Sequence, residues 1–157
     1  MNITIKDENS RFGVRVCAII YNKDMSKVYM QKQGNHDFYM FPGGRLEIGE
    51  DTSSAIEREL YEELGINENL KLKYIAENFI KFPNMHYHEL GFYFILKIDE
   101  QLLKNNLNSM DKKDGESIFE WIDVNMIDNY NIMPNCMKEK VKEKNTSDNI
   151  EHIMYKE

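Results

Sequence analysis

The chain has 157 residues, of which 41% are hydrophobic and 30% are charged, an ordinary balance for one globular domain with a single core. Its formal net charge of −7 argues against duplex nucleic acid as a partner, because proteins that bind it present a basic face. A small anionic substrate is compatible with this charge if a metal supplies local positive charge. From the length of the chain we expect a single domain over residues 1–157.

The N-terminal third predicts a β-hairpin followed by a short strand. Apolar, β-rich runs at residues 15–21 and 27–31 flank a turn sequence at residues 22–24, which is typical of a hairpin. A short strand is expected at residues 39–41, and Pro42-Gly43-Gly44 should end it.

A helix is predicted from Asp51 to Leu64. Its apolar residues recur about every four positions and define one face, formed by Ala55, Ile56, Leu60 and Leu64. Asp51 or Thr52 is expected to cap its start, and Gly65 suits the left-handed position after its end.

The second half of the chain predicts further strands and one more helix. Strands are expected at residues 70–80, 90–98, 117–124 and 150–155, with a helix at residues 134–144. A loop centred on Phe82-Pro83-Asn84 should separate the first two strands, and the polar residues 99–116 should form a partly structured loop. This order indicates an α/β fold in which helices sandwich a mixed β-sheet.

The two cysteines and the N-terminus bear on the cellular compartment. Cys17 and Cys136 show neither metal-ligand spacing nor a disulfide framework, and the apolar run around Cys17 predicts a buried, reduced thiol. The chain opens with Met-Asn-Ile-Thr-Ile-Lys-Asp-Glu, which lacks the apolar core of a signal peptide, and no stretch is long enough to span a bilayer. We therefore expect a cytoplasmic protein with no membrane partner.

Three glutamates on the predicted helix provide the first chemical signal. At 100° per residue, Glu59, Glu62 and Glu63 fall within an arc of about 100° beside the apolar face. Like charges at these spacings disfavour a helix by roughly 0.2–0.5 kcal/mol per pair, a penalty that a divalent cation would reverse. Carboxylate oxygens suit Mg²⁺ or Mn²⁺. By themselves, however, such runs are more often solvated acidic faces.

The residues around this helix complete a longer pattern. The pattern is G-x5-E-x7-R-E-U-x-E-E-x-G-U, with U aliphatic, and all nine positions are filled, by Gly44, Glu50, Arg58, Glu59, Leu60, Glu62, Glu63, Gly65 and Ile66. The segment thus resembles the signature of the Nudix family, and the probability of a chance match is on the order of 10⁻⁷ or less. The resemblance implies a Nudix-type α/β/α sandwich with a mixed β-sheet.

The resemblance also implies a metal site. Glu59, Glu62 and Glu63 would bind the divalent ion, which is expected to be Mg²⁺, with Mn²⁺ as a possible substitute. Arg58 would pair with acidic groups of the motif, chiefly Glu50, and hold the preceding loop on the helix.

Other residues of the segment take supporting roles under the same resemblance. Gly43 and Gly44 would let the backbone turn tightly and approach the metal or the phosphate of the substrate. Arg45, directly after them, is the best placed arginine for a phosphate. Leu60 and Ile66 would be core residues.

The implied reaction is the hydrolysis of a diphosphate bond. A water attacks one phosphorus while metal ions stabilise the charge on the oxygens. In this family the general base is either a motif glutamate or a carboxylate on a distant loop. Glu116, just before the strand that contains Trp121, is the best distal candidate, and Asp114 and Glu120 are alternatives.

The substrate is expected to be a small nucleotide. Pro83 lies near the position of a proline that marks ADP-ribose hydrolases within the family, which favours a nucleoside diphosphate linked to another moiety, with nucleoside triphosphates next. Arg11 and Arg15 are further candidates for phosphate contacts. Four aromatic residues near predicted loops are candidates for stacking on a base, although core packing is commoner: Phe38, Tyr39, Phe82 and Tyr87.

Two other functions occur on the implied fold. A catalytically silent nucleotide-sensing domain usually lacks motif glutamates, which this chain retains. A prenyl diphosphate isomerase needs additional catalytic residues, which the sequence does not reveal. Many relatives are dimers, so a homodimer is a further expectation.

Overall fold

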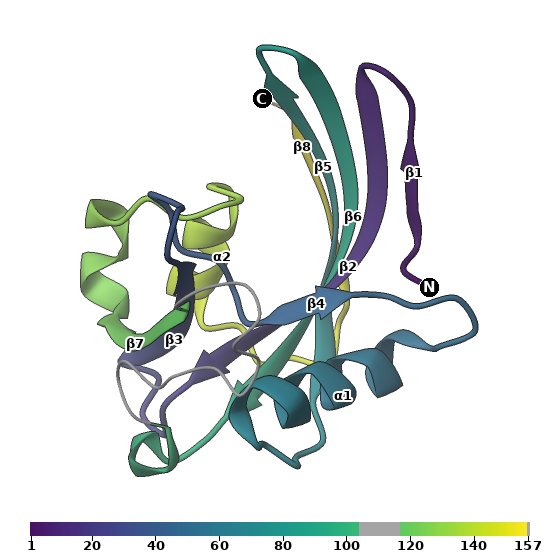
Figure 1. Cartoon of the computed structure of the whole chain (residues 1–157). Coiled ribbons are helices and arrows are strands. Elements are labelled where there is room, and N and C mark those ends of the chain that lie inside the picture. Colours follow the sequence, from purple (N-terminus) through teal and green to yellow (C-terminus); the bar gives the residue numbers. More distant parts are fainter. Residues whose placement is uncertain (104–116, 157) are drawn as a thin grey trace.

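Figure 1 shows the computed structural model of the chain, which describes residues 1–103 and 117–156. The strands are β1 (Thr4–Lys6), β2 (Ser10–Tyr21), β3 (Lys27–Gln33), β4 (Gly43–Arg45), β5 (Lys71–Phe82), β6 (Met85–Lys97), β7 (Ser117–Asp123) and β8 (Glu151–Lys156). The α-helices are α1 (Thr52–Leu64) and α2 (Met137–Glu143), and two 3₁₀ helices are η1 (Glu100–Leu102) and η2 (Val124–Asn129).

The strands form one mixed sheet. Their order is β7-β3-β2-β6-β5-β8, and both β1 and β4 also pair with β2. β2 and β6 run parallel along the whole of β2, from the pair Ser10–His86 to the pair Tyr21–Lys97. β5 and β6 are antiparallel neighbours, as are β3 and β7. β2 is therefore the strand on which most of the sheet is assembled.

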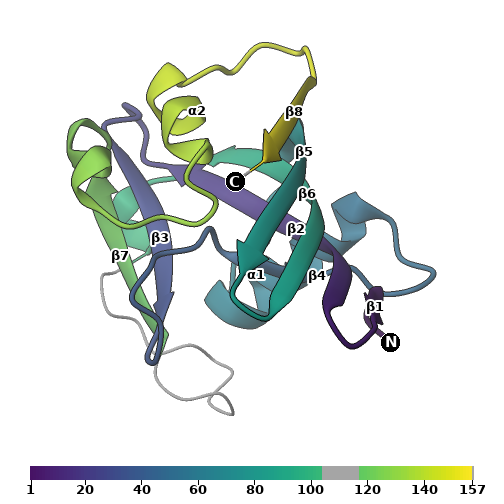
Figure 2. The same ribbon diagram turned by 90° about the horizontal axis from the view of Figure 1, so that it is seen from above.

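Two hydrophobic clusters cover the two faces of this sheet. Alternate residues of β2 point to opposite faces, as the pleat requires. Val16 and Ala18 belong to the first core cluster, together with Leu60 of α1. Cys17 belongs to the second core cluster, together with Val141 of α2. Figures 1 and 2 show the two helices on opposite sides of the sheet, which confirms the predicted sandwich.

Helix α1 begins and ends where the sequence predicts. The carboxylate of Asp51 accepts a hydrogen bond from the backbone N–H of Ser54 at 2.8 Å and so caps the first turn. Gly65 adopts φ 69°, the left-handed conformation that ends the helix. Leu60 and Ile56 are buried on the face directed at the sheet.

The strand predicted at residues 39–41 is wrong, because the strand lies at β4 instead. Tyr39 and Met40 form only isolated bridges, and the two glycines expected to end a strand belong to one. They pair closely with β2: a Cβ on Gly43 would lie 2.0 Å from the carbonyl oxygen of Val16. The Gly-Gly sequence therefore permits close strand pairing and does not break it.

Several other boundaries differ from the sequence-based expectation. β2 starts at Ser10, five residues earlier than predicted, and pairs there with the unpredicted β1. The loop between β5 and β6 is reduced to Pro83 and Asn84, so the two strands form a long hairpin. Polar residues at the strand ends hide these extensions from a pattern based on apolar residues.

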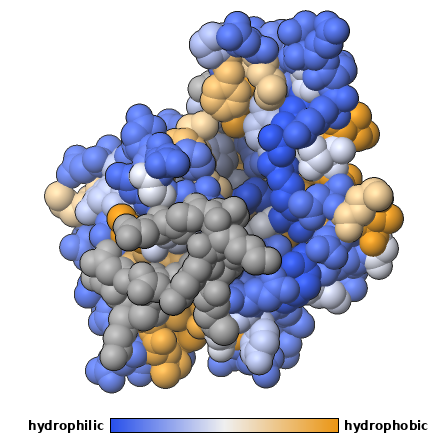
Figure 3. Space-filling model, viewed as in Figure 1, coloured by the Kyte–Doolittle hydropathy of each residue, from blue (hydrophilic) through white to orange (hydrophobic). Residues whose placement is uncertain are grey.

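The surface is mostly polar on the side shown in Figure 3, where hydrophobic residues lie in small separate groups. Within the described residues, no helix is long and apolar enough to cross a membrane.

Candidate active site

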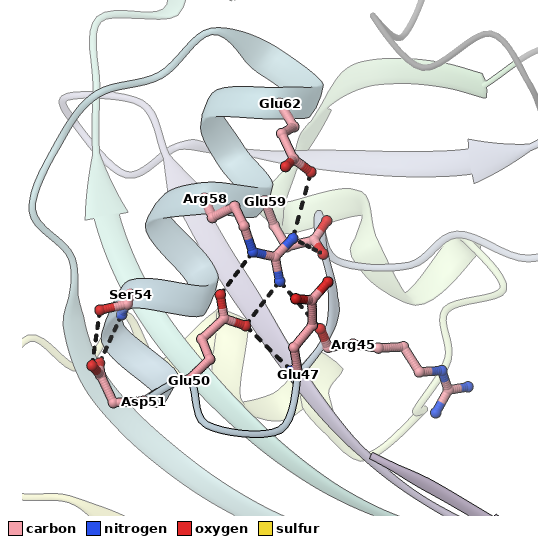
Figure 4. Close-up of polar contacts among 8 residues, drawn as sticks. All are labelled: Arg45, Glu47, Glu50, Asp51, Ser54, Arg58, Glu59 and Glu62. Carbon is pink, nitrogen blue, oxygen red and sulfur yellow. Dashed lines mark hydrogen bonds and ion pairs between the residues drawn. The ribbon is translucent and has the colours of Figure 1, made fainter. Parts of the chain in front are cut away.

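Arg58 organises the first turns of α1 and the loop before it. Its guanidinium donates from Nε and Nη2 to the two carboxylate oxygens of Glu50, at 2.8 and 2.9 Å. Nη1 donates to Glu59 at 2.9 Å and, more weakly, to Glu62 at 3.5 Å. Nη2 also reaches the carbonyl oxygen of Arg45 at 3.4 Å. Figure 4 shows these contacts, which tie the loop to the helix in the manner expected for Arg58 and Glu50.

The three motif glutamates differ in environment. The side chain of Glu62 is 58% exposed, whereas that of Glu59 is 15% exposed. Glu63 is half-buried, and its Oε2 atom is buried without a hydrogen-bond partner. Burial, followed by repulsion from Glu59, raises the pKa of Glu63 to about 8. Burial also raises the pKa of Glu59, although Arg58 opposes the shift.

The donor set fits a hard divalent cation. Carboxylate oxygens are the ligands that Mg²⁺ prefers, and the orphaned Oε2 of Glu63 is a buried acceptor that such an ion would satisfy. Gly44 makes room for Glu59, because a Cβ there would lie 2.2 Å from the Glu59 carboxylate carbon. Residues 1–103 and 117–156 nevertheless contain no group of three or more His, Cys, Asp or Glu side chains arranged around one metal position. Glu59 and Glu62 are instead bonded to Arg58.

A cavity of about 230 Å³ is lined by residues of β2, β4, β5 and β6 and of the loops around them. Arg15 lines it and also lies within electrostatic range of Glu63, so the cavity and the motif carboxylates are neighbours. Its walls are largely aromatic and aliphatic and include Phe38, Phe82 and Tyr93. Complete ligand sites usually enclose about 300–1,000 Å³, so this cavity suits one part of a substrate rather than the whole.

The polar end of the cavity contains a short hydrogen-bond chain. Arg45 Nη2 donates to the hydroxyl of Tyr87 at 2.9 Å, and that hydroxyl donates to Glu89 Oε2 at 2.7 Å. Glu89 is only 9% exposed. Arg15 lies within electrostatic range of both Glu89 and Glu63.

The structure brings most of the predicted binding residues together. Arg15 and Arg45 line the cavity, as do three of the four aromatic candidates, Phe38, Phe82 and Tyr87. The remaining aromatic residue, Tyr39, does not line it and donates its hydroxyl to Glu120 at 2.7 Å.

The candidates for the distal base are less fully described. Glu116 and Asp114 lie outside the described residues. Glu120 is on β7, where Tyr39 occupies one of its oxygens. Sequence reasoning missed Glu89, which belongs to no motif. The available signal was a carboxylate at a position of β6 where the alternation predicts burial.

Comparison with known proteins gives one family and several partial likenesses. The NUDIX domain model matches residues 11–142. An RNA pyrophosphohydrolase from Aeromonas hydrophila is 32% identical over 72 residues, 45% of this chain and 41% of that protein. Another from Legionella pneumophila is 37% identical over 59 residues, 37% of this chain and 34% of that protein. The chain thus spans less than half the length of either relative.

Among solved structures, the MutT protein from Bacillus halodurans has a similar fold. The TM-score is 0.61 over 92% of this chain and 90% of that one, with 19% sequence identity.

Proposed function

This chain belongs to the Nudix family, and on that premise we propose that it is a metal-dependent hydrolase of a diphosphate bond in a small nucleotide-type substrate. The observation that carries the proposal is the complete motif, whose Glu63 has a buried, unpartnered carboxylate oxygen and lies within electrostatic range of Arg15 in the cavity wall. Buried anions without partners are costly, and a cation relieves that cost.

The motif residues would act as follows. Glu59, Glu62 and Glu63 would hold the metal, and Arg58 would keep the loop containing Glu50 against the helix. A bound divalent ion neutralises charge on phosphate oxygens and lowers the pKa of a nearby water.

Arg45 and Arg15 would bind the phosphates from the other side. Both line the cavity, and guanidinium groups suit phosphate oxygens because they offer several N–H donors in one plane. Gly44, directly before Arg45, lies against the Glu59 carboxylate, for which the missing Cβ leaves room. The water would lose its proton to a carboxylate, for which Glu116 is our first candidate.

For the substrate, we favour a nucleoside diphosphate linked to another moiety, of the ADP-ribose or nucleotide-sugar type, with nucleoside triphosphates next. The apolar cavity wall, which includes Phe38 and Phe82, supports a site for a base or a sugar next to the phosphates. The partial likeness to RNA pyrophosphohydrolases adds RNA 5′ ends to the substrates worth testing.

The test is a substrate panel with Mg²⁺, read by product chromatography. It contains ADP-ribose, a nucleotide sugar, the nucleoside triphosphates, a 5′-triphosphorylated RNA oligonucleotide and a prenyl diphosphate. We expect hydrolysis of at least one nucleotide, lost in excess chelator and in Glu63→Gln. Glu57→Gln is the matched control, because Glu57 is an exposed glutamate of the same helix and should retain turnover.

The other outcomes identify the competing functions. Nucleotide binding without any hydrolysis would indicate a silent sensor. Rearrangement of the prenyl diphosphate without hydrolysis would indicate an isomerase. Full turnover in chelator would contradict metal-dependent chemistry.

A further inference from the structure

Tyr87 occupies a position that neither the motif nor the proposed reaction accounts for. Its hydroxyl accepts from Arg45 at 2.9 Å and donates to Glu89 at 2.7 Å, so both of its hydrogen-bonding roles are used at once. All three residues line the cavity. They come from β4 and β6, two strands that are not neighbours in the sheet.

The guanidinium of Arg45 is held on more than one side. Its carbon lies 5.8 Å from the centre of the Tyr87 ring, and Arg11 lies at 5.7 Å from the same ring. Arg45 Nη1 packs against Gly13, where a Cβ would come within 2.2 Å of it. An arginine side chain free in solvent samples many rotamers, and these contacts remove much of that freedom before a ligand binds.

Arg45 still has hydrogen-bonding capacity for an anion. Among the described residues, one N–H of Nη2 is paired with Tyr87, and Nη1 is buried without a partner. An unpaired buried donor is destabilising, and a ligand oxygen that accepts from it removes that cost. Arg45 is thus fixed at one end and unsatisfied at the other, as expected of a preorganised anion-binding group.

Glu89 explains why a hydroxyl is needed between the two charged groups. A direct Arg45–Glu89 ion pair would neutralise the guanidinium with a nearby carboxylate. Because the Tyr87 hydroxyl is hydrogen-bonded to Glu89, it holds Arg45 in place while Glu89 itself accepts no hydrogen bond from Arg45. Burial, reinforced by Glu89, raises the pKa of Tyr87, so the hydroxyl keeps its proton and its donor role at neutral pH.

We propose that Tyr87 is a positioning residue, which with Glu89 fixes Arg45 in the orientation that binds a phosphate of the substrate. The inference rests on the proposed function for the identity of the ligand. Tyr87 itself need not touch the substrate, and its effect on binding should pass through Arg45.

A double-mutant cycle between Tyr87→Phe and Arg45→Ala tests this route. Binding of ADP-ribose is measured by calorimetry in excess chelator, where no metal-dependent hydrolysis occurs. Tyr87→Phe alone should weaken binding by about tenfold, the size of one hydrogen bond to a charged group. In the Arg45→Ala background the same change should alter binding by less than about twofold. With Mg²⁺ and a hydrolysed substrate, Tyr87→Phe should raise KM and leave kcat within about threefold.

A buried hydroxyl elsewhere provides the matched control. Tyr21 donates to the carbonyl oxygen of Val141 at 2.8 Å and does not line the cavity, so Tyr21→Phe should lower the Tm without changing ADP-ribose affinity. If Tyr87→Phe does not fold, Glu89→Gln replaces it in the cycle, with the same expected loss of effect when Arg45 is absent.

Three results would overturn the inference: no binding of ADP-ribose by the wild-type chain, an unchanged affinity of Tyr87→Phe, or an equal effect of Tyr87→Phe with and without Arg45. Failure of the proposed function has a different signature, because the chain would then hydrolyse no member of the panel whatever the outcome of the binding cycle.

Discussion

Glu63 illustrates how a single carboxylate links stability to the proposed chemistry. Its ordinary pKa of 4.5 is raised to about 8, first by burial and then by Glu59. Between these pH values the folded protein holds a proton on Glu63 that the unfolded chain has released. The free energy of unfolding therefore falls as the pH rises from about 4.5 to about 8.

This coupling predicts different pH profiles for two variants in excess chelator. Glu63→Gln lacks the titrating group, so it should lose less stability than the wild type between pH 5 and pH 8. Glu57→Gln should follow the wild-type profile. Urea denaturation at both pH values measures the difference, and parallel profiles for the wild type and Glu63→Gln would show that the carboxyl is not perturbed.

The identity of the general base gives a second prediction for single residues. If Glu116 removes the proton from the water, Glu116→Gln should lower kcat by about 10²–10⁴ with little change in KM. Asp114→Asn and Glu120→Gln should change kcat by less than about threefold. Steady-state kinetics on the three variants compares them directly. Normal kcat in all three would move the base to a motif glutamate, with Glu59 first.

Contacts between individual residues could be predicted from the sequence where the spacing of the motif fixes them. Because Glu50, Arg58 and Glu59 recur at fixed intervals on one turn and helix, their mutual contacts were predictable. The contacts of Tyr87 with Arg45 and Glu89 were not predicted, because Arg45 lies on another strand. Only the pairing of β2 with both β4 and β6 brings these residues together.

At the scale of elements, α1 has one face for the core and another for the site. Leu60 is fully buried in the first core cluster, next in sequence to Glu59. Leu60→Ala should cost roughly 2–5 kcal/mol of stability, since it leaves a cavity where the side chain packed. The adjacent Tyr61 is 62% exposed, so Tyr61→Ala should stay within about 0.5 kcal/mol of the wild type. Urea denaturation of both variants checks the assignment, which equal losses would contradict.

The predicted helices and strands were accurate where capping residues or regularly spaced apolar residues define them in the sequence. Asp51 and Gly65 define α1 in the structure as in the sequence. The prediction failed for β4, because a Gly-Gly sequence signals a turn locally, whereas here it permits close contact with β2. Such contact depends on a strand 26 positions away, Cys17 opposite Gly43, which local pattern does not report.

At the scale of the whole molecule, the two core clusters share the strands of a single sheet. β2 contributes Val16 to one cluster and Cys17 to the other. We therefore predict one cooperative unfolding transition, as expected of a single domain. Circular dichroism and the fluorescence of Trp121, the one tryptophan of the chain, should report the same midpoint.

Variants on opposite faces make this prediction sharper. Leu60→Ala perturbs the first core cluster and Val141→Ala the second, and each should shift both signals together. Separate midpoints for the two signals in either variant would indicate two independently unfolding units.

The parallel pairing of β2 with β6 also constrains how the protein folds. Ser10 pairs with His86, so the centre of the sheet closes a loop of nearly half the chain, and contacts between such distant segments slow folding. The β5–β6 hairpin, with its two-residue connection, can form early. During synthesis the motif emerges well before β6, which supplies Tyr87 and Glu89. A segment that is continuous in the sequence thus becomes a complete site only after the later half of the chain has docked.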